Sequence, residues 1–446
     1  MTQSPADSEI LDVGRRLLER FPASARNPLR AADDRAVELA SQDAALRAAL
    51  FRFVDVVPAC RSLDELAAHL VSFVSEVEHP PVPLEVAMRM GNSRAGRLAL
   101  GGAAAAGVRH IAHRFIVAET PQGAARVLRE LWREGVGTSV DLLGEATVTA
   151  EEADRYAARC EQALEELASV YAGLPPRREL EADSLGAIAR ANLSVKVSAL
   201  TPLLRADAPE IGERDAAPRL RALLRQAKRH RAHLHVDMES FDSREAITEL
   251  VLSLLSEEEF RDGPSAGLVL QAYLVDSQAL CERILTWARG CARPQPLVVR
   301  LVKGAYWDHE VVDARQHGWR SPVFEEKAAS DRNFEALTLE LLRARPLVRP
   351  AIASHNLRSV AHAIVANRQL GAGPRELEFQ VLRGLGDDLQ QALAAEGYRV
   401  RAYCPIGELI AGMAYLVRRL LENTSNESFL AERAHGRPLE ELLGAP

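Results

Sequence analysis

The sequence predicts an α/β protein built on a TIM-like (β/α)8 barrel that is preceded by an all-helical arm region. Three observations favour this fold. Residues 1–134 show helical patterns only, short apolar runs alternate with helix-length stretches from residue 135 onward, and polar side chains gather at the ends of those runs. We therefore expect two domains, a helical arm over residues 1–134 and a barrel over residues 135–446 whose last helix has a ligand-binding face.

Composition and charge argue against several classes of protein. Of the 446 residues, 47% are hydrophobic and 26% are charged, as is usual for a globular protein. The formal net charge of -7 disfavours a nucleic-acid-binding protein, because phosphate binding needs an excess of Lys and Arg. The five cysteines show no CxxC spacing, which favours reduced thiols in a cytoplasmic protein over disulfides or a zinc site.

Membrane insertion is not expected either. The polar N-terminus shows no signal-peptide pattern. The most apolar run, residues 98–111, is interrupted by Arg109 and His110. It is too short to cross a bilayer, which needs about 20 apolar residues. Any membrane contact should therefore be peripheral.

Five helices are expected in the first region, at residues 8–19, 31–50, 63–75, 84–116 and 120–134. Their apolar residues recur at helical spacing, and prolines separate them. The region contains no metal-ligand spacing, phosphate-binding loop or nucleophile motif, so we interpret it as a wrapping or arm segment.

Eight short runs rich in Val, Ile and Leu are expected to form strands. They lie at residues 137–144, 193–200, 233–239, 267–274, 297–305, 350–356, 377–383 and 398–406. Each gap between them can hold a helix, and eight strand–helix units in about 310 residues fit a barrel. The alternative is an open doubly wound sheet, which is disfavoured because no run has a GxGxxG turn.

Polar residues lie at the carboxyl end of each expected strand, which is where the active site of such a barrel is found. They are Asp141 and Glu145, Lys196, Asp237 and Glu239, Gln271 and Tyr273, Arg300 and Lys303, His355 and Asn356, Gln380 and Arg383, and Tyr403. The amino ends are bland by comparison. A single inward charge could be one half of a core ion pair, but polar residues at every strand end indicate a binding site.

Two segments suit a phosphate-bearing, flat-ringed cofactor. Residues 300–307 combine two cations, a glycine that lets the backbone approach a ligand, and two aromatic residues. Residues 354–356 add three short hydrogen-bonding side chains. Gln271 and Gln380 add amides that can pair with the edge of a heteroaromatic ring. Taken singly, each Gln or His is more often a satisfied buried polar group.

A helix expected at residues 414–423 carries Tyr415, Arg418, Arg419 and Glu422 on one face, at positions i, i+3, i+4 and i+7. Adjacent guanidinium groups can grip a planar carboxylate in a bidentate fork. Alone, such a face would more often be a solvated surface. Because it follows the last expected strand, we expect it to cover the barrel mouth and to bind a small carboxylate.

Hydrolytic chemistry is the alternative that the residues leave open. No serine or cysteine has an evident His and Asp partner set. His233, His235, Asp237 and Glu239 alternate along one expected strand and so face the same side. This pattern allows a metal-dependent barrel hydrolase, although the first two positions would lie deep in the barrel or at its wrong end.

Six segments resemble motifs of the proline dehydrogenase family, and most closely those of the proline dehydrogenase module of bifunctional proline utilisation A proteins. They are residues 194–200 (SVKVSAL), 237–239 (DME), 301–308 (LVKGAYWD), 354–356 (SHN), 380–384 (QVLRG) and 415–424 (YLVRRLLENT). They follow the order of the family over about the last two-thirds of the chain, and the last is highly specific. The helical first third resembles the family's arm more loosely.

The resemblance implies a distorted (β/α)8 barrel that holds FAD non-covalently. It implies oxidation of L-proline to (S)-1-pyrroline-5-carboxylate, the first step of proline degradation to glutamate, with electrons passed to a membrane quinone. A cytoplasmic enzyme in peripheral contact with the inner face of the cell membrane is expected. This sequence lacks the aldehyde dehydrogenase half and the basic DNA-binding segment of the bifunctional proteins, so we expect a separate pyrroline-5-carboxylate dehydrogenase and no nucleic-acid partner.

The resemblance also implies roles for individual residues. The substrate site would comprise Lys196, Asp237, Tyr306, Leu382, Tyr403, Tyr415, Arg418 and Arg419. The FAD site would comprise Gln271, Arg300, Lys303, Gly304, Ala305, Trp307, Lys327, His355, Asn356 and Gln380. Glu145 or Glu422 would pair with an arginine and gate the site. Beside the flavoenzyme and the metal-dependent hydrolase, an amino-acid-binding protein that uses the same arginine face is the third hypothesis.

Overall fold

The computed structural model describes residues 7–22, 43–91, 93–144, 146–291, 293–408, 412, 415 and 437–446. The chain divides into two compact units. The first comprises Met1–Phe21, Thr120–Ile406 and Leu439–Pro446, and the second comprises Pro22–Glu119 and Gly407–Pro438. The predicted boundary at residue 134 falls within the first unit, because α1 (Asp7–Glu19) and α7 (Pro121–Arg133) belong with the barrel strands.

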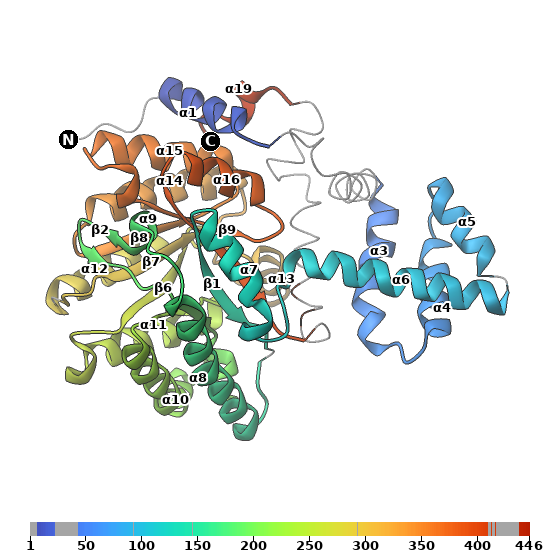
Figure 1. Ribbon diagram of the computed structural model, residues 1–446, viewed down its shortest axis with the longest axis horizontal. Coiled ribbons are helices and arrows are strands. Elements are labelled where there is room, and N and C mark those ends of the chain that lie inside the picture. Colours follow the sequence, from blue (N-terminus) through green and yellow to red (C-terminus); the bar gives the residue numbers. More distant parts are fainter. Residues whose placement is uncertain are drawn as a thin grey trace. The chain divides into compact units, whose positions relative to one another are not determined.

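A closed barrel of eight parallel strands forms the centre of the first unit (Figure 1), which confirms the predicted fold class. Around the barrel the order is β1, β4, β5, β6, β7, β8, β9 and β10, and β10 pairs with β1. The bounds are β1 (Val136–Leu142), β4 (Asn192–Val195), β5 (His233–Val236), β6 (Ser265–Gln271), β7 (Leu297–Val302), β8 (Val348–Ala353), β9 (Glu378–Leu382) and β10 (Arg399–Ile406). Each overlaps one of the eight predicted runs.

Helices follow the strands and surround the barrel (Figure 1). They are α8 (Ala150–Ala172), α10 (Pro209–His230), α11 (Phe241–Ser256), α12 (Ser277–Cys291), α13 (Trp307–His317), α14 (Lys327–Arg343), α15 (Leu357–Gln369) and α16 (Asp387–Ala395). Short helices α9 (Arg178–Glu181) and α19 (Leu439–Leu442) complete the first unit.

Successive residues of each strand face opposite sides, so the barrel has an apolar outside and a polar inside. Val140, Leu193 and Leu234 are fully buried, as expected for strand residues covered by helices. In contrast, Ser139 and Ser194 accept hydrogen bonds from Arg300 across the interior. This polar interior supplies the lower wall of the candidate site.

The strands end earlier than the predicted runs. Because β4 ends at Val195 and β5 at Val236, Lys196 and Asp237 lie just beyond them, at the carboxyl end of the barrel. Residues 197–199, which were expected to continue a strand, form a 3-10 turn, η3. Lys196 and Asp237 are therefore carried by loops that start from a rigid barrel.

The amino end of the barrel is more polar than expected. An unpredicted hairpin of β2 (Ala182–Asp183) and β3 (Gly186–Ala187) lies there. Asp183 accepts hydrogen bonds from Arg349 and Arg399, near the starts of β8 and β10. The description of the amino ends as bland is thus wrong, because buried arginines on these strands pair with carboxylates from other segments.

The second unit contains helices α3 (Ala44–Val56), α4 (Leu63–Val74), α5 (Val82–Met90) and α6 (Arg94–Phe115). The helix predicted at residues 84–116 is thus two helices. Ser93 caps the second of them, since its side chain accepts a hydrogen bond from the backbone of Gly96 at 3.0 Å. Helices α4 and α6 pack closely because Gly101 has no side chain, and a Cβ there would meet the Leu63 carbonyl oxygen at 2.0 Å.

Within the described residues, no helix is both long enough and apolar enough to cross a membrane.

Candidate active site

The ammonium group of Lys196 lies at the carboxyl end of the barrel between two carboxylates. Nζ donates to Oδ1 of Asp141 at 2.6 Å and lies 3.5 Å from Oδ2 of Asp237. Burial lowers the pKa of Lys196, but these two carboxylates raise it by more, so the pKa lies above its ordinary value. About 24% of the lysine side chain stays exposed. The site therefore presents a fixed, fully charged cation at its mouth.

Asp237 joins four side chains from the ends of three other strands, β4, β7 and β10. It accepts hydrogen bonds from Ser194 at 2.7 Å, Arg300 at 2.5 Å and Tyr403 at 2.7 Å, beside the Lys196 contact. Burial raises the pKa of Asp237, but Lys196 and Arg300, together with the hydroxyl donors, outweigh that effect and hold it below its ordinary value. Asp237 is therefore an ionised anchor, and not a proton donor at neutral pH.

Arg300 fills the barrel centre below Asp237. Its guanidinium also donates to Gln380 at 2.6 Å and to Ser139 at 3.1 Å. It lies 5.3 Å from the centre of the Tyr403 ring, within the range of a cation–π contact. Arg300 is 4% exposed, so its charge is satisfied by protein groups in this structure.

The Tyr403 hydroxyl acts as a donor only. Burial, together with the carboxylates of Asp141 and Asp237, raises the pKa of Tyr403 well above its ordinary value. Tyr403 pairs with Leu382 across β10 and β9. The hydroxyl group of Tyr403 thus binds Asp237, while the tyrosine ring and the neighbouring leucine form an apolar wall.

Two lysines predicted to bind a cofactor share one carboxylate. Lys303 and Lys327 both bind Asp331, the second at 2.7 Å. Burial lowers the pKa of Lys303, although Asp331 acts in the opposite direction. Two cations against one carboxylate leave a net positive charge that suits a phosphate group.

The backbone beside these lysines is open to close approach. Gly304 has a φ of +147°, and a Cβ there would come within 2.4 Å of the Tyr273 ring. Ala305 is exposed. Tyr306 precedes α13 as its N-cap residue, and the indole of Trp307 donates to the Phe324 carbonyl at 2.9 Å while staying 39% exposed.

Two further predicted residues have structural roles in this loop cluster. His355 Nε2 accepts from the backbone N–H of Leu382 at 2.9 Å. The Asn356 side chain caps α15 by accepting from Ser359 at 3.0 Å. They fix the ends of β8 and β9 beside the mouth, and their contact with a cofactor stays a prediction.

The Gln271 amide is only half satisfied. Its Nε2 donates to the Glu239 carbonyl at 3.0 Å. Its Oε1 is buried without a hydrogen-bond partner in the part of the chain that the structure describes. A buried orphan acceptor is costly, which indicates a ligand that carries an N–H group.

Residues 124–432 match the proline dehydrogenase family. The chain belongs to this family. Residues 7–115 also match the N-terminal domain of proline utilization A.

Relatives of the proline dehydrogenase family cover most of this chain. This chain is 32% identical over 351 residues to the bifunctional protein PutA of Escherichia coli K12. The matched stretch covers 76% of this chain and 25% of that protein. It is 28% identical to proline dehydrogenase 1 of Bacillus subtilis strain 168, over 74% of this chain and 92% of the relative. The chain thus spans about a quarter of the length of its bifunctional relatives.

Solved structures show the same architecture. Proline utilization A from Bdellovibrio bacteriovorus, inactivated by N-propargylglycine, matches 99% of this chain and 44% of its own, with a TM-score of 0.90 and 34% identity. A proline utilization A variant from Bradyrhizobium japonicum matches 99% of this chain and 46% of its own, with a TM-score of 0.75 and 27% identity.

Proline dehydrogenases are in general flavoenzymes, and the described residues fit a flavin nucleotide. The orphan Oε1 of Gln271 can accept from the imide N–H of a flavin ring. Lys303 and Lys327 supply positive charge for a pyrophosphate, and the exposed backbone of Gly304 lies beside them. Gln271 is the last residue of β6, and Lys303 and Gly304 follow the neighbouring strand β7.

Some predicted site residues lie outside the described residues. These are Arg418, Arg419, Glu422 and Glu145. Tyr415 is described, but it belongs to the second unit. Their predicted roles therefore stay predictions.

Three polar residues that complete the interior were not predicted as site residues. Ser139 and Ser194 bind Arg300, and Asn192 accepts from Ser139 at 2.8 Å. A signal was present, because Ser139 and Ser194 stand two positions before Asp141 and Lys196 and so share their inward face.

The expected histidine strand offers no metal site. His233 and His235 bond to each other at 3.1 Å, and the described residues contain no group of three or more His, Cys, Asp or Glu side chains that could hold a metal ion.

Proposed function

We propose that this protein is a proline dehydrogenase that binds FAD non-covalently and oxidises L-proline to (S)-1-pyrroline-5-carboxylate, the first step of proline degradation to glutamate. The observation that carries the proposal is the cluster of Lys196, Asp237 and Tyr403, which places a fixed cation beside an apolar wall at the barrel mouth. Membership in the family supports it.

The substrate is held by its carboxylate and its ring. Lys196 contributes one charge-assisted contact to the carboxylate, and the predicted arginines Arg418 and Arg419 contribute a bidentate grip. Tyr403 and Leu382 pack against the pyrrolidine ring, with Tyr306 and Tyr415 as further predicted walls. FAD, when bound, supplies the acceptor for the two electrons. The protein's own task is to orient the ring, and a carboxylate fixed on one side with an apolar wall on the other achieves this.

Electron transfer and product removal need partners. We propose a membrane quinone as the final acceptor, reached through peripheral contact of a cytoplasmic enzyme with the inner face of the cell membrane. A separate pyrroline-5-carboxylate dehydrogenase would oxidise the released product. Reduction of a soluble quinone by proline, measured with and without anionic lipid vesicles, tests the first part.

The proposed activity is tested by anaerobic titration of the FAD-reconstituted protein with L-proline. The flavin absorbance band should bleach with proline and stay unchanged with glycine, which has a carboxylate and an amine but no ring. A protein that takes up no FAD, or a flavin that proline does not reduce, would refute the proposal. Since a relative is inactivated by N-propargylglycine, that compound should also inactivate this protein.

A further inference from the structure

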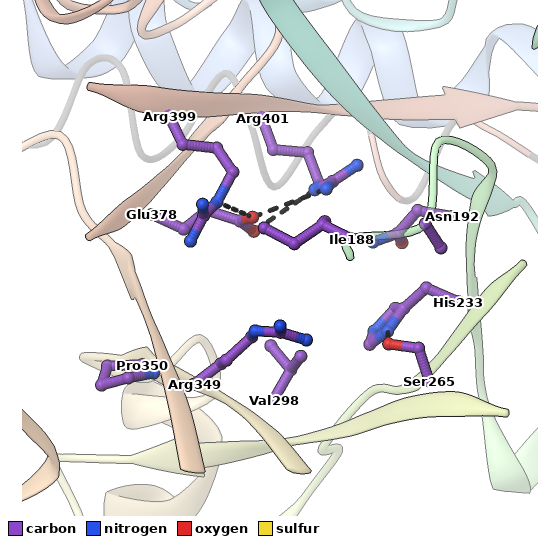
Figure 2. Close-up of a pocket in the computed structure, with 11 residues that line it drawn as sticks. Ile188, Asn192, His233, Ser265, Val298, Arg349, Pro350, Glu378, Arg399 and Arg401 are labelled. Carbon is purple, nitrogen blue, oxygen red and sulfur yellow. Dashed lines mark hydrogen bonds and ion pairs between the residues drawn. The ribbon is translucent and has the colours of Figure 1, made fainter. Parts of the chain in front are cut away.

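A small, partly open cavity lies at the amino end of the barrel, opposite the candidate active site. Its lining includes Asn192, His233, Ser265, Arg349 and Arg401, from five different strands. Figure 2 shows the guanidinium of Arg349 reaching into the space that separates the Glu378 cluster from His233. The cavity volume is about 20 Å³, room for about one water-sized guest.

The charges around this cavity do not cancel. Three arginines, Arg349, Arg399 and Arg401, surround two carboxylates, Asp183 and Glu378. The arginines are 2–5% exposed. Three positive charges against two negative charges leave one positive charge in excess, in a place where solvent screens poorly.

Among the described residues, no other titratable group at this end supplies the missing negative charge. The nearby Arg345–Glu376 and Arg190–Glu181 pairs are each balanced. Burial lowers the pKa of His233 to about 3, so the imidazole is neutral. Burial alone would raise the pKa of Glu378, yet Arg401 and Arg399 bring it to about 2, so that carboxylate is already counted as charged.

The cavity also has more donors than acceptors. Arg349 uses Nε and Nη2 for its bonds to Asp183 and Gly186, and no hydrogen bond among the described residues uses Nη1. Asn192 accepts from Ser139 through Oδ1, and its Nδ2 likewise has no partner in the described part of the chain. Both side chains are more than nine-tenths buried, so a guest in the cavity is the acceptor within reach of these two donors.

We propose that this cavity binds one small inorganic anion of chloride size. Such an ion accepts hydrogen bonds from Arg349 and Asn192 and cancels the excess charge of the arginine cluster. A water molecule could accept the same bonds but would leave the charge uncompensated. The proposal is independent of the proline dehydrogenase function, because the cavity lies at the opposite end of the barrel.

The first test is anomalous diffraction from crystals grown in bromide, which replaces chloride and is located by its own scattering. An anomalous peak between Arg349 and Asn192 is expected. Density there without an anomalous signal would identify water and overturn the proposal. This test uses the unmodified protein and so does not depend on any variant folding.

The second test compares the melting midpoint Tm in sodium chloride and in sodium gluconate at the same ionic strength, since gluconate is too bulky to enter. A ligand that binds only the folded state stabilises it, so Tm should be a few degrees higher in chloride. Equal midpoints in the two salts would overturn the proposal.

Two variants and a control sharpen this comparison. Asn192→Asp places a carboxylate in the cavity, so it should remove the chloride dependence and raise Tm in gluconate. Arg349→Met removes the excess charge and should also remove the dependence. Arg345→Met is the control, because Arg345 binds Glu376 at the same end but does not line the cavity. A chloride effect that persists in Asn192→Asp would overturn the assignment.

Discussion

Nζ of Lys196 lies 2.6 Å from Oδ1 of Asp141, a carboxylate that is only 1% exposed. Among the described residues of the predicted substrate site, Asp141 forms a hydrogen bond with Lys196 alone, so it acts through the lysine as a positioning residue. The pair comes from neighbouring strands, since Asp141 is in register with Ser194 two positions before Lys196. The direction in which the lysine cation points is thus set by the barrel wall.

Asp141→Asn should lower kcat/KM for proline at least tenfold, because a hydrogen bond to a charged group contributes about 1.5–3 kcal/mol. The effect should lie mainly in KM, since the lysine is proposed to hold the substrate carboxylate, and FAD content should not change. Asp154→Asn, which weakens a surface pair with Arg219, is the matched control. Equal KM values in both variants would show that Asp141 does not position Lys196.

Tyr403→Phe removes a single hydrogen bond to Asp237 while keeping the ring. That bond lowers the pKa of Asp237, so its loss should raise this pKa. Since the ionised carboxylate is the form that anchors Lys196 and Arg300, the acid limb of the kcat/KM profile should move to higher pH. A profile that coincides with that of the unmodified enzyme would contradict this role.

Gly304→Ala should reduce FAD binding. The added Cβ would lie within 2.4 Å of the Tyr273 ring, at a φ of +147° that side chains rarely adopt. Gly318→Ala is the control, because its φ of +67° is also positive but its surroundings are open. The measurement is flavin stoichiometry after reconstitution. Full FAD content in Gly304→Ala would show that the packing of this segment on Tyr273 does not shape the cofactor site.

Arg419→Met tests the predicted carboxylate grip, at a position outside the described residues. KM for proline should rise strongly while FAD stays bound, because only the substrate loses a bidentate contact. Arg89→Met on α5, whose side chain is 78% exposed, is the control. An unchanged KM would refute the role given to Arg419.

The buried histidines should make the free energy of unfolding depend on pH. Burial lowers the pKa of His233 from 6.5 to about 3, so the unfolded chain binds more protons than the folded one between these values. The stability from this group is therefore complete above pH 6.5 and is lost as pH falls toward 3.

His233→Gln should accordingly flatten the decline of the unfolding free energy between pH 6.5 and 5, measured by urea titration. The slope should not vanish, since His235 is lowered in the same way. His69→Gln, at an exposed position on α4, should leave the slope unchanged. A His233→Gln slope equal to that of the unmodified protein would contradict the prediction.

The eight strands could be predicted because each is a run of Val, Ile and Leu that the helices cover on one side. Their ends could not be placed, since residues 197–199 are as apolar as β4 itself. What turns them into η3 is tertiary: Glu239 accepts from the backbone and hydroxyl of Ser198. The β2–β3 hairpin gave no local signal either, because ion pairs between Asp183 and distant arginines hold it.

The site was predictable as a set of positions, but not as a set of bonds. Lys196, Asp237, Arg300 and Tyr403 were all expected at the mouth, and the structure joins them into one network. That Asp237 is the centre of this network depends on its distances to three other strands, which a periodic pattern does not contain.

The pairing of β1 with β10 has a consequence for how the chain acquires its fold. The two strands share seven residue pairs, from Val136 with Val400 to Leu142 with Ile406, although most of the barrel sequence separates them. Contacts between such distant segments make folding slow, because the intervening chain must be ordered first. During synthesis the barrel cannot close until β10 has left the ribosome, so its polar interior would stay open to water until then.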